Sequence, residues 1–278
     1  MKHIDGNFKS VRGIDIYYQG WLPEGKVKAV VFVVHGLGEH SGRYMNVVNH
    51  FTPQGYAIYG LDHIGHGKSG GDRELVVQFD DFTAPLTTYY TMVKSWHPDK
   101  PIFILGHSMG GLIGCYYLLD HQEYFKGAII SAPAIKVGES VSQTTITMGK
   151  ILSVIAPKAG VLALDANNIS KDPEVVKAYV NDPLVFHEKT PARLAAEMLK
   201  AMLRVTDEAG KITIPFIAVQ GSADKLVDPG GIRILENKTS SLDKTIKVYD
   251  GLYHEVFNEP ERQIVLKDVE NWLDAHLK

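Results

Sequence analysis

The stretch Leu105-Gly106-His107-Ser108-Met109-Gly110-Gly111 has a serine between two glycines, in the pattern Gly-x-Ser-x-Gly. The apolar run before it, residues 101–105, has the composition of a buried strand, and residues 112–119 after it have that of a buried helix. A serine at such an abrupt strand-to-helix turn is typical of a nucleophile elbow, where a strained backbone projects the hydroxyl above a sheet. The glycines remove Cβ atoms that would collide with the neighbouring strand and helix. We therefore predict that Ser108 is a nucleophile.

The overall composition is that of an ordinary globular protein, since 45% of the 278 residues are hydrophobic and 22% are charged. This length allows one large α/β domain with an insertion, or two small domains. A net charge of −3 gives no reason to expect nucleic acid as a partner. The single cysteine, Cys115, excludes a disulfide within the chain. The first residues lack the apolar core of a signal peptide and no run is long enough to span a bilayer, so we expect a cytoplasmic protein, by default a monomer.

The order of the apolar patterns predicts a mostly parallel sheet. Residues 8–21 alternate around Arg12-Gly13, which suits an antiparallel hairpin. Strand-like runs then alternate with helical patterns, and the first of these runs is continuously apolar, which is typical of a strand covered on both faces. These runs are residues 29–34, 56–61, 101–105, 127–131, 215–220 and 245–249. We expect an α/β fold with helices on both faces of the sheet.

The alternation stops between about residues 134 and 190. This segment has no clear strand, but it has apolar helical patches, such as residues 146–155 and 161–164. We predict a core made of residues 1–133 and 191–278, with residues 134–190 inserted as a mainly helical cap over the open end of the sheet. The apolar residues of the cap either pack on the core or contact lipid, and packing is the expectation for any single residue.

A serine hydroxyl needs a base beside it and a carboxylate that orients the base. In this architecture the partners follow in the order serine, acid, histidine, each in the loop after a later strand. One strand-like run ends shortly before Asp224 and the next ends shortly before His254. We predict that Ser108 is the nucleophile, Asp224 the acid and His254 the base. Asp228 is the alternative acid, although it is better placed to cap the following helix.

The tetrahedral intermediate of acyl transfer needs backbone N–H donors for its oxyanion. One donor is expected from Met109, the residue after the nucleophile, at the positive end of its helix. The other is expected from Leu37, in the glycine-containing loop at residues 35–38 that ends the strand at residues 29–34. A simple tight turn is the alternative reading of that loop taken alone.

Two other signals are discounted. Asp62, His63 and His66 look like a metal cluster, but their spacing matches no established ligand set. Gly67-Lys68-Ser69 looks like the end of a phosphate-binding loop, but the required glycine five positions earlier is absent. We therefore expect no metal and no cofactor.

Several longer motifs together are more specific than the elbow alone. They are residues 35–44 (HGLGEHSGRY), 62–69 (DHIGHGKS), 106–111 (GHSMGG), 181–184 (NDPL) and 220–225 (QGSADK). With these motifs the sequence resembles the monoacylglycerol lipase group of serine α/β-hydrolases, with lysophospholipases as near relatives. The resemblance implies an α/β-hydrolase fold, a mobile cap over an apolar acyl tunnel, and a small polar pocket for the glycerol head.

By matching motif positions, the resemblance implies that Glu39 and Arg43 shape the glycerol pocket and that Tyr179 reaches it from the cap. A surface ion pair and a packed aromatic ring are the alternatives for these side chains.

We predict a cofactor-free carboxylic ester hydrolase that cleaves monoacylglycerols and similar lipophilic monoesters through an acyl-enzyme. A lysophospholipase, a thioesterase and a general carboxylesterase share this chemistry and differ only in the pocket. Two alternatives lie outside catalysis, namely a ligand-binding protein that keeps the hydrolase fold and a membrane-bound interaction protein that uses the apolar cap. The expected partner is a small lipophilic ester, with transient contact between the cap and membranes as a further expectation.

Overall fold

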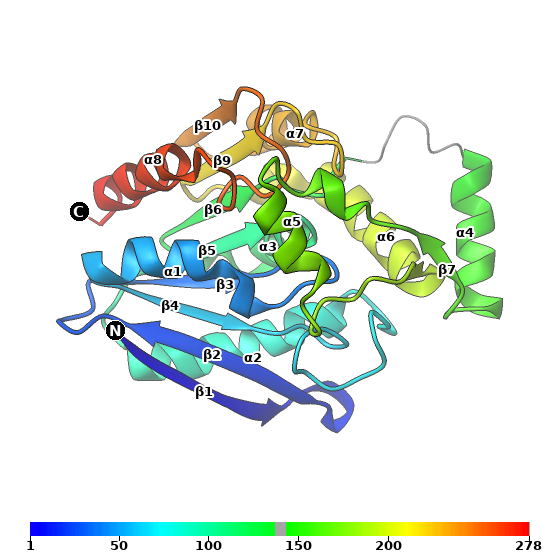
Figure 1. The fold of residues 1–278 in the computed structure, drawn as a ribbon, viewed down its shortest axis with the longest axis horizontal. Coiled ribbons are helices and arrows are strands. Elements are labelled where there is room, and N and C mark those ends of the chain that lie inside the picture. The colour runs from blue at the N-terminus through cyan, green and yellow to red at the C-terminus, as the bar shows by residue number, and fades with distance from the viewer. Residues whose placement is uncertain (137–142, 278) are drawn as a thin grey trace.

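The computed structural model describes residues 1–136 and 143–277 and shows a central eight-stranded sheet (Figure 1). The strand order is β1-β2-β4-β3-β5-β6-β9-β10, with β1, β2 and β4 paired antiparallel and all later pairs parallel. The predicted mostly parallel sheet is therefore confirmed. The strands are β1 (Lys2–Lys9), β2 (Asp15–Leu22), β3 (Ala29–Val34), β4 (Tyr56–Leu61), β5 (Ile102–His107), β6 (Gly127–Ser131), β9 (Phe216–Gly221) and β10 (Lys244–Tyr249).

Helices cover both faces of the sheet because the parallel strands are apolar on both sides. In β3, Val31 and Val33 pack with α1 (Met45–Phe51) and α8 (Arg262–Ala275). The alternate side chains of β3 pack with the helices of the opposite face. Those helices are α2 (Asp80–Trp96), α3 (Met109–His121), α6 (Ala192–Glu208) and α7 (Gly231–Lys238). Short 3₁₀ helices are η1 (Val11–Gly13), η2 (Ser41–Tyr44), η3 (Thr52–Gln54), η4 (Gln122–Tyr124), η5 (Ala166–Asn168) and η6 (Ala209–Lys211).

The predicted hairpin joins β1 and β2, with Lys9 opposite Asp15. Its turn has positive φ angles at Arg12 (54°) and Gly13 (70°), and the glycine adopts this conformation without strain. Cys115 is buried in α3. The remaining strands and helices lie within a few residues of their predicted positions, and α6 is longer than the pattern indicated.

The segment between β6 and β9 departs from the prediction in one respect. Besides α4 (Gln143–Ile155) and α5 (Pro173–Val180), it contains an antiparallel pair, β7 (Gly160–Leu162) with β8 (Thr190–Pro191). The expectation of no strand was wrong because three and two residues are too few for a period-2 pattern. Residues 137–142 of the predicted cap and the side chain of Ile146 lie outside the described residues.

Helix α4 packs against α6, which itself packs on α3, while α5 lies over the carboxyl ends of the strands (Figure 1). Among the described residues, no helix combines the length and the apolar character needed to cross a bilayer.

Candidate active site

Ser108 lies at the turn between β5 and α3 with φ 56° and ψ −120°, a strained backbone conformation for a residue with a side chain. A Cβ on Gly110 would lie 2.0 Å from the carbonyl oxygen of Val34. A Cβ on Gly106 would lie 2.4 Å from the carbonyl oxygen of Gly110. Since backbone cannot move aside easily, both flanking positions require glycine, as the sequence pattern predicted.

Asp224 and His254 come from the loops after β9 and β10 and meet in the structure. The Nδ1 of His254 lies 2.7 Å from Oδ2 of Asp224. A carboxylate can only accept, so Nδ1 carries the hydrogen and Nε2 is left with its lone pair. The Oδ2 atom also accepts from Gln220 Nε2 at 2.9 Å, and Oδ1 accepts from the N–H of Leu226 at 2.8 Å.

Burial alone would raise the pKa of Asp224, but its hydrogen bond with His254 and the two backbone N–H groups that it accepts hold that pKa below the usual range. The carboxylate therefore stays ionised at neutral pH. The alternative acid, Asp228, points elsewhere, since it pairs with Lys136 at 2.8 Å. Its Oδ1 also accepts from the N–H of Gly230, just before α7, and its backbone carbonyl oxygen accepts from the N–H of Gly231, the first residue of α7.

The expected nucleophile and base face one small cavity. Ser108 and His254 both line it, together with Leu37 from the core and Tyr179 from α5. Within the described residues the Ser108 hydroxyl forms no hydrogen bond with His254, and such contacts are often long before substrate binds. Among residues 1–136 and 143–277, the N–H groups of Leu37 and Met109 have no hydrogen-bond acceptor.

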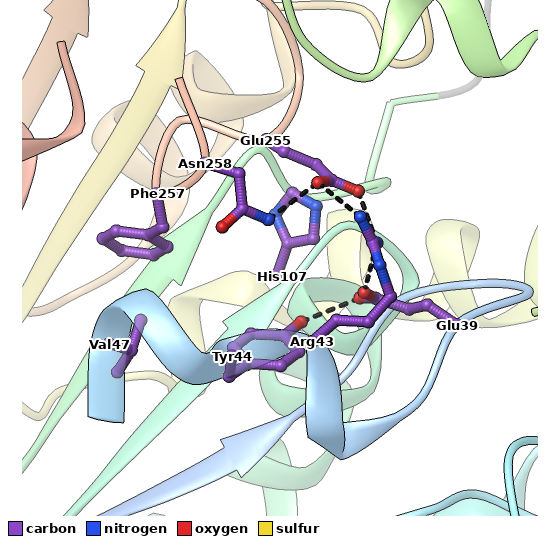
Figure 2. Close-up of a pocket in the computed structure, with 8 residues that line it drawn as sticks. All are labelled: Glu39, Arg43, Tyr44, Val47, His107, Glu255, Phe257 and Asn258. Atoms are coloured by element: carbon purple, nitrogen blue, oxygen red, sulfur yellow. Dashed lines mark hydrogen bonds and ion pairs between the residues drawn. The ribbon is translucent and has the colours of Figure 1, made fainter. Parts of the chain in front are cut away.

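Glu39, Arg43 and Glu255 form a chain of buried charges beside this cavity (Figure 2). Arg43 Nη1 lies 2.8 Å from Oε2 of Glu39 and 2.6 Å from Oε1 of Glu255. Arg43 Nη2 lies 2.8 Å from the other oxygen of Glu255. The Arg43 side chain is only 10% exposed and that of Glu39 only 6%, so the alternative of a surface ion pair is wrong. Tyr179 is a packed aromatic that also lines the cavity, with the Arg43 guanidinium 4.6 Å from its ring centre.

The pKa values of these three side chains depend on their burial and on one another's charge. Burial raises the pKa of Glu39, and the positive charge of Arg43 only partly opposes this. Burial would raise the pKa of Glu255 too, but its two bonds to Arg43 hold that pKa below the usual range. Arg43 stays charged, because its two carboxylate partners outweigh the effect of burial and raise its pKa.

Sequence reasoning missed three residues that belong to this site. Glu255 directly follows the expected base, and Gln220 opens the 220–225 motif, so their positions were signals that went unused. His107 lies inside the elbow motif, and its ring centre lies 4.7 Å from that of His254. Burial lowers the pKa of His107 to about 3, so its ring is neutral at pH 7.

Asp62, His63 and His66, which the sequence analysis discounted as a metal cluster, are buried in the core. His63 donates its backbone N–H to Nε2 of His35 at 2.8 Å, and Asp62 accepts from the N–H and hydroxyl of Ser41. Burial lowers the pKa of His63 to about 3 and that of His66 to about 4, so both rings stay neutral. No group of three or more His, Cys, Asp or Glu side chains within residues 1–136 and 143–277 is arranged to hold a metal ion.

The sequence and the fold have counterparts among known proteins. A family model described as Serine aminopeptidase, S33 (Hydrolase_4) matches residues 25–261. The chain belongs to this family. It is therefore a serine hydrolase, and the elbow with the Asp224–His254 pair lies within the matched residues.

Individual relatives extend the match to almost the full chain. A monoacylglycerol lipase of Mycolicibacterium smegmatis is 39% identical over 98% of this chain and 97% of its own length. A monoglyceride lipase of Rattus norvegicus is 34% identical over 94% of this chain and 88% of its own. The crystal structure of a Paleococcus ferrophilus monoacylglycerol lipase superposes with a TM-score of 0.83 at 29% identity, covering 99% of this chain and 100% of that one. The α/β-hydrolase fold predicted from the sequence is thereby confirmed.

Proposed function

We propose that the protein hydrolyses monoacylglycerols to a fatty acid and glycerol through an acyl-enzyme on Ser108. The observation that carries the proposal is the strained Ser108 turn, which lines the same small cavity as a His254 ring held by Asp224. The similarity to relatives named as monoacylglycerol lipases supports the substrate class.

In the first half of the reaction, rotation of the Ser108 side chain brings Oγ to Nε2 of His254. As Oγ attacks the ester carbonyl, its proton passes to Nε2, and the ionised Asp224 stabilises the resulting imidazolium. The negative oxygen of the tetrahedral intermediate accepts from the N–H groups of Leu37 and Met109, which have no other partner among the described residues. The imidazolium then protonates the departing glycerol oxygen.

In the second half, water attacks the carbonyl of the acyl-enzyme and gives one proton to Nε2 of His254. Collapse of the second intermediate breaks the bond to Ser108 Oγ, which takes that proton back. The fatty acid leaves, and the free enzyme is restored. These steps need only side chains, backbone N–H groups and water.

In this proposal the core and the inserted segment have different roles. Residues 1–133 and 191–278 supply the reacting groups, and residues 134–190 act as the cap. From the cap, Leu164 and Ile169 give the cavity an apolar lining that suits an acyl chain, whereas Tyr179 lies on its polar side beside Arg43.

The cap also suits contact with a lipid surface that holds the substrate. Its outer face carries large apolar side chains that are between 45% and 74% exposed. They are Met148, Ile151, Val154 and Ile155 on α4, with Val161 and Leu162 on β7. Vesicle flotation tests this: replacing Val154 and Ile155 by serine should reduce the bound fraction, and an unchanged fraction would remove this part of the proposal.

A substrate panel with purified protein tests the proposed reaction. We expect the highest kcat/KM on a monoacylglycerol, lower values on short 4-nitrophenyl esters, and lower values again on lysophosphatidylcholine or an acyl thioester. A preference for lysophosphatidylcholine would instead make the protein a lysophospholipase, and turnover of short esters alone would make it a general carboxylesterase. Folded protein with no hydrolysis of any member would favour a ligand-binding role.

A further inference from the structure

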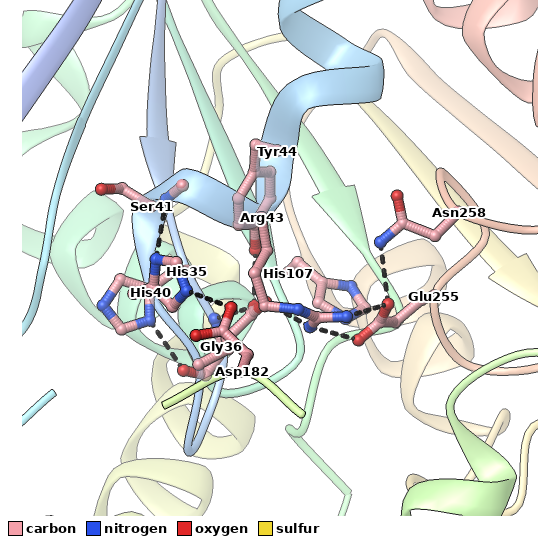
Figure 3. A network of polar contacts seen from close by, with 12 residues as sticks. His35, Gly36, His40, Ser41, Arg43, Tyr44, His107, Asp182, Glu255 and Asn258 are labelled. Atoms are coloured by element: carbon pink, nitrogen blue, oxygen red, sulfur yellow. Dashed lines mark hydrogen bonds and ion pairs between the residues drawn. The ribbon is translucent and has the colours of Figure 1, made fainter. Parts of the chain in front are cut away.

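Glu39, Arg43 and Glu255 connect the two loops from which the proposed reacting groups come. Figure 2 labels all three side chains, and Figure 3 shows Arg43 and Glu255 together with the polar groups around them. Glu39, at one end of this series of charged side chains, bonds to the 35–38 loop, and Glu255, at the other end, belongs to the loop after β10.

Glu39 holds the peptide group that lies next to the proposed oxyanion donor, the N–H of Leu37. Oε1 of Glu39 accepts from the N–H of Gly36 at 2.6 Å. His35 Nε2 accepts from the N–H of His63, so His35 Nδ1 carries a hydrogen and donates it to the Gly36 carbonyl oxygen at 2.8 Å. Because a trans peptide is planar, fixing this carbonyl also fixes the Leu37 N–H in the opposite direction.

Arg43 holds Glu255, the residue next to the proposed base His254. Both terminal nitrogens of Arg43 bond to the Glu255 carboxylate, in a fork that restricts position as well as charge. Glu255 directly follows His254, and its own N–H donates to the carbonyl oxygen of Ile169 at 2.8 Å. The stacking of Tyr179 on the Arg43 guanidinium adds a second contact with the 134–190 segment.

The carboxylate oxygens of Glu39 and Glu255 already have donors within the protein. Glu39 accepts from Gly36 and Arg43, and also from the Tyr44 hydroxyl at 2.9 Å. Glu255 accepts from Arg43 and from Asn258 Nδ2 at 2.8 Å. Every carboxylate oxygen therefore has at least one protein donor, which fixes the position of both carboxylates.

We infer that Arg43 is a positioning residue: acting through Glu39 and Glu255, it holds the Leu37 N–H and the His254 ring in one reactive geometry. The family resemblance implied only that Arg43 shapes the glycerol pocket, whereas the role inferred here acts on the reacting groups. The inference rests on the hydrolysis proposed above, and it assigns to Arg43 a contribution to kcat on every ester, whatever its alcohol.

A monoacylglycerol and the methyl ester of the same fatty acid distinguish positioning of the reacting groups from glycerol binding. The two substrates share one acyl chain, but the methyl ester has no glycerol. We expect Arg43→Gln to lower kcat by about 100-fold on both, with KM changed by less than about threefold, since small misplacements of reacting groups slow the chemical step. Arg43→Lys should give intermediate kcat values on both, because an ammonium keeps the charge but loses the fork. Arg204→Lys is the control, since Nη2 of Arg204 bonds to both oxygens of Asp120 on α3 outside the site, and the kcat of this variant should stay unchanged.

A rise in KM on the monoacylglycerol alone, with the methyl ester unaffected, would overturn the inference and make Arg43 a glycerol ligand. Unchanged kcat on both esters would overturn it as well. If Arg43→Gln does not fold, Arg43→Lys and Glu255→Gln replace it and must show the same equal loss on both substrates. Failure of the wild-type protein to hydrolyse either ester would count against the proposed function itself, which keeps the two failures distinct.

Discussion

The core side of the cavity is made by loops at the carboxyl ends of β3, β5 and β10, whereas the opposite side comes from the segment between β6 and β9. On the core side, Ser108, Asp224 and His254 are held by backbone strain, close glycine contacts and short hydrogen bonds. On the other side, a small apolar cluster around Ile169 and Tyr179 is accompanied by strongly exposed apolar residues on α4. The proposed reacting groups therefore lie on the side with the closer contacts, whereas the opposite side buries fewer apolar residues.

The largest expected effect concerns the acid on the core side. Asp224→Asn should lower kcat by about 10⁴-fold, because an amide that donates to His254 favours the wrong tautomer of the ring. Asp228→Asn, four residues away in the same loop, is the control and should change kcat by less than about threefold, since its ion pair with Lys136 lies outside the site. Steady-state kinetics on a monoacylglycerol measure both. Equal losses in the two variants would remove Asp224 from its proposed role.

A second comparison tests the packing of the two sides. Leu105 in β5 is fully buried, so Leu105→Ala should lower the free energy of unfolding by about 2–5 kcal/mol. Ile155 at the end of α4 is 74% exposed, so Ile155→Ala should change it by less than about 0.5 kcal/mol. Urea unfolding followed by tryptophan fluorescence gives both values. A large loss in Ile155→Ala would mean that α4 is covered in solution.

A third prediction concerns Glu74, a buried carboxyl at the junction of the two sides, close to Gly38. Burial raises the pKa of Glu74 to about 7, and the Thr190 hydroxyl only partly opposes this. The folded state therefore binds a proton that the unfolded state releases above about pH 4.5, so stability falls as pH rises through this range to about 7. Relative to wild type, Glu74→Gln should gain up to about 3 kcal/mol between pH 5 and pH 8, at about 1.4 kcal/mol per pKa unit. A stability difference that is constant across these pH values would contradict the burial effect.

The core of the fold was predictable because its signals are local. The central strand β3 is a continuous apolar run bounded by turn residues, and the elbow is a pattern within seven residues. The order of Ser108, Asp224 and His254 followed from one rule about loops after strands. The strands β7 and β8 were missed because they are too short to show a period, and β7 is exposed along its whole length.

The contacts of the site were less predictable because they join residues that are far apart in the chain. Arg43 and Glu255 are separated by 212 positions, and no local pattern shows that they pair. The motif placed Glu39 and Arg43 near the site, but their burial and their bonds to both loops depend on the packing of the folded chain. The same holds for His107, whose neighbour His254 comes from a different strand end.

Covalent labelling of Ser108 tests the central claim most directly. The native protein is treated with a fluorophosphonate, digested and mapped by mass spectrometry, while loss of monoacylglycerol hydrolysis is followed in parallel. We predict a single adduct on the peptide that contains Ser108, formed at the rate at which activity disappears, and no adduct in folded Ser108→Ala. An adduct at another residue, or full activity in Ser108→Ala, would contradict the account.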